Sequence, residues 1–318
     1  MEEIVPLLLG GLILFLFAIT QLSEVMKGVF TKKAEFAIQK YTKNIFSGIL
    51  IGAVLTIALD SSSAVIILTI IFINSKVLTF KQAIGIIMGA NIGTTISSQI
   101  IAMDIGKYAV IPLAIGLIFE VFAEKAKTKR IGHILLYTGM LFFGLHLMGV
   151  SVGSLEDSDL FREWIARINN NYIQGTLIGG LITLIIQSSS GTVAIAIILG
   201  KQNLITAAGG IAIMFGTELG TCADTLLATI KGSRQAIKAG LFHLLFNLLT
   251  IAIGLLVFIP FVQLVQLIST TQDIGNQIAN AHVLFNVLGV ILFLPFVGWM
   301  EKLLNWMLPD RKKQPQGA

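Results

Sequence analysis

Residues 175–190 read GTLIGGLITLIIQSSS, and residues 48–63, which lie 127 positions earlier, read GILIGAVLTIALDSSS. The two stretches align without a gap, and the match continues downstream, where GANIGT at 89–94 recurs as GTELGT at 216–221. Glycines and polar residues carry much of this match, so shared hydrophobicity alone does not explain it. The sequence therefore predicts an internal duplication.

The composition around these stretches predicts a membrane protein. The 318 residues are 55% hydrophobic and 12% charged, with a mean hydropathy of +0.87, whereas a soluble domain carries about 25% charged residues. An apolar helix of roughly 20 residues spans a bilayer core. Seven stretches are of this kind: Ile4–Met26, Ile84–Met103, Val110–Ala123, Ile131–Val150, Leu204–Ile230, Ala236–Ile259 and Ala279–Met300. The first lacks the basic flank and cleavage site of a signal peptide, so we expect it to be retained.

The two serine-containing stretches, 45–73 and 172–200, are too long for one span and are broken midway. We predict that each is a re-entrant helical hairpin. Each repeat would then contain a span, a hairpin and two further spans, so the second repeat would be inverted relative to the first, as in secondary transporters. The predicted fold is an all-α integral membrane protein with two inverted-topology repeats and an additional C-terminal transmembrane helix. Its parts are repeat 1 at 1–130, repeat 2 at 131–268, the additional helix at 279–307 and a polar tail at 308–318.

The charged loops predict the orientation. Lysines follow the first span, the 124–130 loop is basic, and the C-terminal tail carries Arg311, Lys312 and Lys313. The positive-inside rule places these segments in the cytoplasm and the N-terminus outside. The net charge of +5 is thus explained by a lipid bilayer rather than by nucleic acid. We expect a multi-pass protein of the plasma or inner membrane. The sequence does not decide whether it forms a homodimer.

The serine breaks predict ion binding. Irregular backbone cannot face lipid, so each break must be buried or line a wet cavity. The half-helix that starts after the serines offers free N–H groups to an anion, and the half-helix that ends before them offers carbonyl oxygens to a cation such as Na⁺. Alternatively, the serines serve helix packing or bond back to the preceding turn. We expect partial unwinding beside the hairpins, at the polar residues Asn91, Thr94, Thr95, Thr192 and Thr221.

At these motifs the chain resembles the type II sodium/phosphate cotransporter family. The resemblance rests on Gln187-Ser188-Ser189-Ser190, on the stretch Gly89–Thr95 and on Ala279-Asn280-Ala281-His282. It implies Na⁺-coupled uptake of inorganic phosphate by alternating access, without enzymatic activity and with Na⁺ as coupling ion. The implied phosphate-binding residues are Ser61, Ser62, Ser63, Ser188, Ser189, Ser190, Gln187, Thr192 and Asn91. The implied residues for sodium or proton coupling are Asp60, Gln187, Ser62, Ser189, Asn91, Thr94, Thr95, Glu218, Thr221 and Asp224.

Three carboxylates depart from the family pattern. Asp60 replaces the glutamine of the first hairpin, Glu218 replaces the asparagine of the second repeat, and Asp224 stands where hydroxyls are usual. A carboxylate beside phosphate repels it unless Na⁺ or a proton neutralises the charge. The alternative function is therefore a proton-coupled or cation transporter of the same fold.

Other function classes find less support in the sequence. A membrane enzyme or scaffold acting on a lipid phosphate could use the same anion site, but no nucleophile–base pair supports it. The four histidines lie on separate spans without metal-ligand spacing, which favours structural hydrogen bonds over a transition-metal site. The sequence has no Gly-x-x-x-x-Gly-Lys-[Ser/Thr] loop for ATP.

Overall fold

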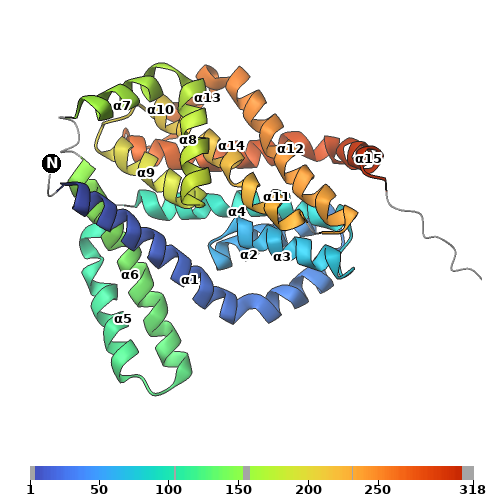
Figure 1. Ribbon diagram of the computed structural model, residues 1–318, viewed down its shortest axis with the longest axis horizontal. Helices are drawn as coiled ribbons and strands as arrows, with labels where there is room; N and C mark the ends of the chain where they lie inside the picture. Colours follow the sequence, from blue (N-terminus) through green and yellow to red (C-terminus); the bar gives the residue numbers. More distant parts are fainter. Residues whose placement is uncertain (1–3, 104, 153–157, 231, 310–318) are drawn as a thin grey trace, which may run out of the picture.

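The computed structural model describes residues 4–103, 105–152, 158–230 and 232–309. Within these ranges every regular element is a helix, and the α-helices are accompanied by the short 3-10 helices η1 and η3. The elements are α1 (Ile4–Tyr41), α2 (Ile45–Leu59), α3 (Ser62–Asn74), α4 (Phe80–Ala102), η1 (Gly106–Tyr108), α5 (Val110–Phe122), α6 (Ala126–Val152), α7 (Asp159–Asn170), α8 (Tyr172–Ile186), α9 (Ser189–Lys201), α10 (Ala207–Gly220), α11 (Cys222–Thr229), α12 (Arg234–Leu256), α13 (Phe258–Ile268), α14 (Ile274–Phe293), η3 (Leu294–Phe296) and α15 (Val297–Met307). Figure 1 shows α5 and α6 extending together away from the other helices, with α1 alongside α6.

The packing of the helices repeats along with the sequence. In the first half α2 packs along α4, and in the second half α8 packs along α10. A Cβ atom added to Gly89 of α4 would collide with the carbonyl oxygen of Ile49 in α2, and one added to Gly216 of α10 would collide with that of Thr176 in α8. Both contacts are related by the same shift of 127 residues. The duplicated sequence therefore forms two halves with the same local packing.

Both serine stretches are broken helices, as the sequence predicts. The first consists of α2 and α3 and the second of α8 and α9, so their outer ends, residues 45–74 and 172–201, agree with the predicted hairpins to within one residue. These are short helices of 13 or 15 residues. That each pair of helices is re-entrant, entering and leaving on the same side of the membrane, stays a prediction.

Six segments of the described chain are long and apolar enough to cross a membrane. They correspond to six of the seven predicted spans. The seventh, Val110–Ala123, contains α5, whose 13 residues extend only about 20 Å. The last span is interrupted by the 3-10 helix η3 between α14 and α15, which contains Pro295, a residue that cannot donate a backbone hydrogen bond.

The first helix is longer than expected. The apolar stretch Ile4–Met26 continues as helix to Tyr41, although lysines follow it. Residues 27–41 contain lysine, alanine, glutamate and glutamine, which favour helix in water, so the end of the apolar stretch does not end the helix. The α1 helix therefore carries the chain beyond the predicted span.

The expected unwinding of the fourth helix is wrong. The α4 helix is continuous through Asn91, Thr94 and Thr95. The hydroxyls of Thr94 and Thr95 donate to the carbonyl oxygens of Ala90 and Ile92, so these polar side chains are satisfied without opening the helix. In the second half only Thr221 separates α10 from α11. A further helix, α13, follows α12 between the predicted spans Ala236–Ile259 and Ala279–Met300.

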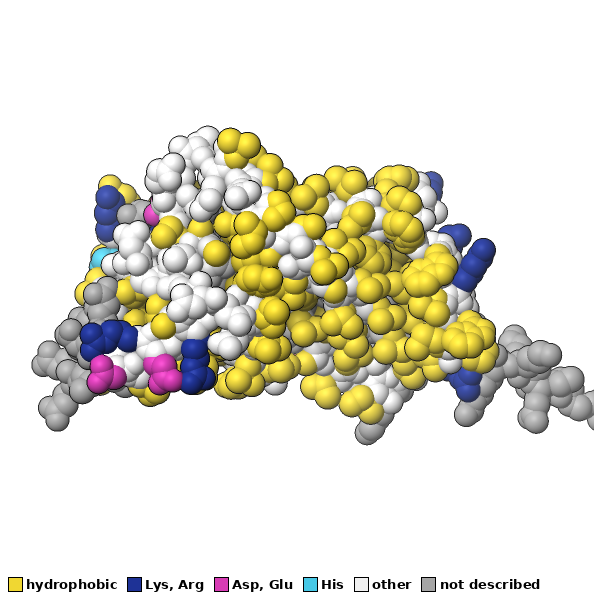
Figure 2. Space-filling view, turned by 90° about the horizontal axis from the view of Figure 1, so that it is seen from above, with side chains coloured by type: hydrophobic (Ala, Val, Ile, Leu, Met, Phe, Trp, Pro, Cys, Tyr) yellow, Lys and Arg dark blue, Asp and Glu magenta, His cyan; other side chains and the backbone are white. Residues whose placement is uncertain are grey.

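The surface agrees with a membrane environment. Figure 2 shows hydrophobic side chains over the middle of the visible face, and lysine and arginine side chains toward its two ends. Large apolar side chains of α5, such as Val121 and Phe122, are 63% and 77% exposed. Such an apolar band is expected of a protein surrounded by lipid.

Candidate functional site

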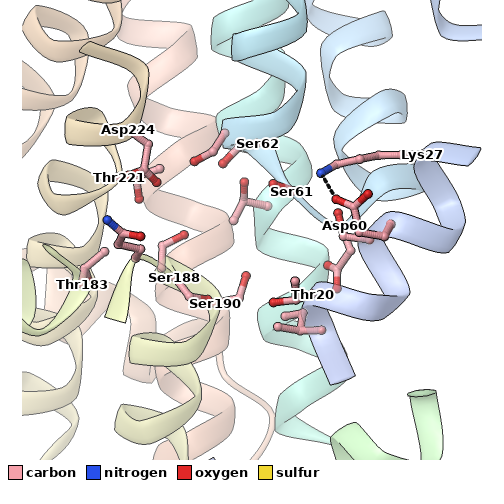
Figure 3. Close-up of a pocket in the computed structure, with 17 residues that line it drawn as sticks. Thr20, Lys27, Asp60, Ser61, Ser62, Thr183, Ser188, Ser190, Thr221 and Asp224 are labelled. Carbon is pink, nitrogen blue, oxygen red and sulfur yellow. Dashed lines mark hydrogen bonds and ion pairs between the residues drawn. The ribbon is translucent and has the colours of Figure 1, made fainter. Parts of the chain in front are cut away.

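The two helix breaks meet in one cavity of about 200 Å³. Figure 3 shows Ser61 and Ser62 of the first break facing Ser188 and Ser190 of the second across a common space. The breaks are distant in sequence, and their contact creates a polar space inside a largely apolar bundle. Eleven of the predicted site residues line the cavity: Asp60, Ser61, Ser62, Ser63, Thr94, Gln187, Ser188, Ser189, Ser190, Thr221 and Asp224.

The backbone has the same geometry at both breaks. Asp60 ends α2 with φ 51° and ψ 34°, and Gln187 ends α8 with φ 56° and ψ 32°. Both residues are in the left-handed region, which ends a helix and turns the chain. Residues other than glycine seldom adopt it, and aspartate tolerates it better than most. This backbone conformation terminates the first half-helix in each repeat.

The first serine of each triplet begins the next half-helix. Ser61 Oγ accepts a hydrogen bond from Ala64 N at 3.1 Å, and Ser188 Oγ accepts one from Gly191 N, also at 3.1 Å. Serine is a favoured N-cap because its oxygen satisfies an N–H group that has no partner within the helix. The remaining N–H groups of the first turns, with the positive ends of the α3 and α9 dipoles, lie beside the cavity and favour an anion.

Two carboxylates line the same cavity. Asp60 accepts a hydrogen bond from the hydroxyl of Ser97 in α4. Asp224 of α11 lines the cavity together with Ser63 of α3, and α11 packs against α3, so a carboxylate of the second half lies near the first break. These carboxylates bring negative charge to a place where the helix N-termini favour an anion. The cavity therefore suits an anion together with cations rather than an anion alone.

The first helix contributes a polar face that sequence reasoning missed. Thr20, Ser23, Glu24 and Lys27 all line the cavity. Their spacing of three, four and seven residues puts them on one side of α1, and this pattern within an apolar span was a signal that could have identified them. Lys27 Nζ lies 2.6 Å from Glu24 Oε1, and the side chains are 40% and 59% exposed, so this pair lies at the mouth of the cavity. Thr183 of α8 was also missed.

Four predicted site residues lie outside the lining. Asn91 donates to Asn247 Oδ1 at 2.6 Å. Thr95 donates to the carbonyl oxygen of Ile92, and Thr192 to that of Ser188. Glu218 is only 7% exposed. The described structure thus brings these four side chains into buried contacts beside the cavity and not into its wall.

Glu218 belongs to a buried hydrogen-bond network. Its Oε1 lies 2.8 Å from His282 Nε2 and 2.8 Å from Asn286 Nδ2, both on α14. His282 Nδ1 in turn lies 2.6 Å from Ser98 Oγ of α4. The network joins both halves of the duplication to α14. Of the four histidines, His282 is thus the one placed against a predicted site residue.

The donor set of the cavity fits oxyanions and alkali ions. Hydroxyls can donate to phosphate oxygens or ligate Na⁺, and the C-terminal carbonyls of α2 and α8 can join the carboxylates around a cation. In the part of the chain that the structure describes, no group of three or more histidine, cysteine, aspartate or glutamate side chains is arranged to hold a metal ion.

Comparison with known proteins gives one family. The sequence model of the Na⁺/Pi-cotransporter family matches residues 14–150 and 156–294, in two parts, which agrees with repeated halves. The chain is 28% identical to the uncharacterized protein YqeW of Bacillus subtilis, over 94% of this chain and 97% of that protein.

Other relatives align with this chain over a smaller share of their own length. The putative inorganic phosphate export protein YjbB of Escherichia coli is 24% identical over 81% of this chain and 47% of its own length. The sodium-dependent phosphate transport protein 2B of Homo sapiens is 37% identical over 30% of this chain and 14% of that protein. No solved structure matches the chain.

Proposed function

Because the chain belongs to the Na⁺/Pi-cotransporter family, we propose that it moves inorganic phosphate across a membrane in symport with Na⁺. The family makes the chain a transporter and not an enzyme, which confirms the resemblance predicted from the sequence and removes the lipid-phosphate enzyme as an alternative. The coupling ion, the substrate and the direction of transport are parts of the proposal.

The observation that carries the proposal is the meeting of the two serine breaks in one cavity. Two half-helices begin there, at Ser62 and Ser189, so two positive dipole ends and several hydroxyls surround the same space. Phosphate needs such donors when it leaves water. Asp60 and Asp224 supply negative charge for cations, and bound Na⁺ would offset their repulsion of phosphate. Anion and cation would thus bind together, which is the physical basis of symport.

Alternating access follows from the same arrangement. We propose that α2–α3 and α8–α9 are re-entrant hairpins from opposite sides of the membrane, with the N-terminus outside and the C-terminus in the cytoplasm. Inverted repeats then allow the cavity to open to either side. The Escherichia coli relatives carry the name of a putative phosphate exporter, so both directions of transport have to be measured.

Transport into and out of proteoliposomes tests the function. We expect labelled phosphate to accumulate only with an inward Na⁺ gradient and to leave loaded vesicles when the gradient is reversed. The variant Ser189→Ala removes a cavity hydroxyl, and the KM for phosphate should rise roughly tenfold, since a hydrogen bond to a charged group contributes about 1.5 kcal/mol or more. Ser75→Ala, at the far end of α3 and outside the cavity lining, is the control. Phosphate movement that ignores Na⁺ in both directions would refute the coupling.

The second candidate function is a proton-coupled or cation transporter, and the carboxylates in the cavity favour it. The variants Asp60→Gln and Asp224→Asn each remove one negative charge from the lining. If Na⁺ binds at these carboxylates, each variant should lower the apparent affinity for Na⁺. A proton gradient should then not change the rate of transport. If protons bind there instead, a proton gradient directed into the vesicle should drive wild-type transport in the absence of Na⁺. Both variants should abolish this dependence on the proton gradient.

A further inference from the structure

A second cavity lies beside the one at the serine breaks, which is called the central cavity from here on. The second cavity has a volume of about 240 Å³ and is lined by residues of α1, α2, α4 and α6. Its lining in the described chain is apolar except for Asp60, Ser97 and Thr138. It is called the side pocket below.

The side pocket lies at the seam between two pairs of helices. The α1 helix packs along α6, and α2 packs along α4. In the described chain the two pairs meet mainly through α1 and α2, so α4 and α6 are not closely packed against each other. The side pocket occupies the space that remains between them.

The side pocket is open toward the lipid. Ile96 and Ile100 of its lining are 39% and 42% exposed, whereas Ile101, Leu141 and Phe142 are 6% exposed or less. The exposed side chains form a mouth and the buried ones an inner wall. Both mouth residues belong to α4, which is long and apolar enough to cross a membrane. A ligand would therefore enter the side pocket from the hydrocarbon of the bilayer.

Asp60 lies at the boundary between the two cavities. It lines both of them, and it accepts a hydrogen bond from Ser97, which lines the side pocket and not the central cavity. Among the residues that the structure describes, no lysine, arginine or histidine forms an ion pair with Asp60. A carboxylate beside apolar walls is unfavourable unless a cation or a proton compensates its charge. A cationic group that enters the side pocket would supply this compensation.

The size and polarity of the side pocket fit an amine that carries an apolar group. A cavity of about 150 Å³ lined by leucine, isoleucine and phenylalanine binds benzene, so the side pocket has room for a ring on a short chain. A primary ammonium group has three N–H donors and no acceptor. The polar members of the lining are one carboxylate and two hydroxyls, all of which can accept hydrogen bonds. An uncharged lipid chain would leave the carboxylate without compensation.

We propose that the side pocket binds a lipophilic amine from the bilayer, with the ammonium group against Asp60 and Ser97 and the apolar group between α4 and α6. A lipid acyl chain is the other occupant, which the test below separates. The consequence for transport rests on the proposed function. An ammonium group at Asp60 would take the place of a coupling cation, so the amine would compete with Na⁺.

Binding of radiolabelled phenylbutylamine to the full chain in detergent tests this proposal. The assay contains neither phosphate nor a Na⁺ gradient, so its result is independent of transport. We expect saturable binding that excess unlabelled phenylbutylamine displaces and that the same concentration of phenylbutanol, its uncharged analogue, does not. In Asp60→Asn the Kd should rise at least tenfold, which corresponds to about 1.4 kcal/mol, because the charge that pairs with the ammonium group is lost.

Three further variants separate the side pocket from other sites. Asp224→Asn removes the other carboxylate of the central cavity, which does not line the side pocket, and it should keep the wild-type Kd. Ile100→Trp places a large ring at the mouth and should abolish saturable binding. Ile115→Trp on α5 is its matched control, because Ile115 is 40% exposed and lies outside the lining; this variant should bind the amine as the wild type does.

Several results would overturn the proposal. An equal loss of binding in Asp224→Asn and Asp60→Asn, or unchanged binding in Ile100→Trp, would place the amine outside the side pocket. Displacement by phenylbutanol as effective as that by the amine would assign the pocket to uncharged chains such as lipid acyl chains. Absence of saturable binding to the wild type would also refute the proposal, whatever the transport assays show.

Discussion

At the scale of single residues, the chain places its unusual carboxylates in different surroundings. Asp60 and Asp224 line the central cavity, whereas Glu218 is buried against His282 and Asn286. A coupling role for Glu218 stays a prediction from the sequence. Its contacts support another role, in which the carboxylate and the imidazole compensate each other and hold α10 against α14. The roles of Asp60 and Asp224 can therefore be distinguished by experiment from the role of Glu218.

The Glu218–His282 pair gives a prediction of stability. In His282→Ala the Glu218 carboxylate loses its imidazole partner while still buried, and the free energy of unfolding should fall by about 3–5 kcal/mol. Glu218→Gln keeps an acceptor oxygen for both partners and should be milder. Thermal or denaturant unfolding in detergent measures both effects.

The double variant Glu218→Gln/His282→Ala provides the control for this pair. Without the carboxylate, loss of His282 should destabilise the protein less than half as much as it does in the wild type. Equal losses in the two backgrounds would show that the two side chains do not interact energetically.

At the scale of helices, the sequence predicted the breaks well because their cause is local. A serine that can cap a helix follows a residue that ends the previous one, and the repeat presents this signal twice, at Ser61 and Ser188. The continuity of α4 was missed because the back-bonding of Thr94 and Thr95 depends on their side-chain rotamers. The length of α1 was missed because hydropathy reports where lipid ends and not where the helix ends.

The close approach of the helices within each half gives a prediction about glycine. Gly89→Ala and Gly216→Ala each place a methyl group against a backbone carbonyl of the neighbouring helix. Overpacking commonly costs about 1–3 kcal/mol, and we expect both variants to reach the upper part of this range because the obstacle is backbone. Unfolding in detergent should show similar losses for the two related positions.

Gly10→Ala in α1 is the matched control for these variants. No atom lies within 4 Å of its added Cβ, and alanine favours helix over glycine by about 1 kcal/mol. This variant should be as stable as the wild type or more stable. A large loss at Gly89 with none at Gly216 would mean that the two halves do not depend on the same packing.

At the scale of the whole molecule, the duplication and the central cavity could be foreseen, whereas the wall that completes the cavity could not. The match between residues 48–63 and 175–190 implies that both breaks have equivalent neighbours. It says nothing about which outside helix closes the space between them. That helix is α1, through Glu24 and Lys27 among others, and its place depends on packing against α6. The polar spacing within α1 marks a face that avoids lipid, but which space this face closes depends on tertiary packing and not on a local pattern.

The orientation of α5 decides the number of crossings and can be tested with introduced cysteines. Lys107→Cys and Lys125→Cys lie at the two ends of α5, in a background in which the buried Cys222 is replaced by alanine. If this short helix crosses the membrane, an impermeant thiol reagent applied from outside should label position 107 and spare position 125. Labelling of both positions from one side would contradict the predicted topology and leave six crossings.

Among the described residues, the polar face of α1 has no counterpart at the central cavity in the second half, although the halves are duplicated. The positions 127 residues after Thr20, Ser23 and Glu24 hold Leu147, Val150 and Ser151, and none of these lines the central cavity. A carrier with two interchangeable halves would present equal binding constants to both of its aqueous compartments. In the part of the chain that the structure describes, the central cavity has one charged rim, so we expect a transport cycle that is intrinsically sided: half-saturation for the same solute should differ between the two compartments even when voltage and gradients are set to zero.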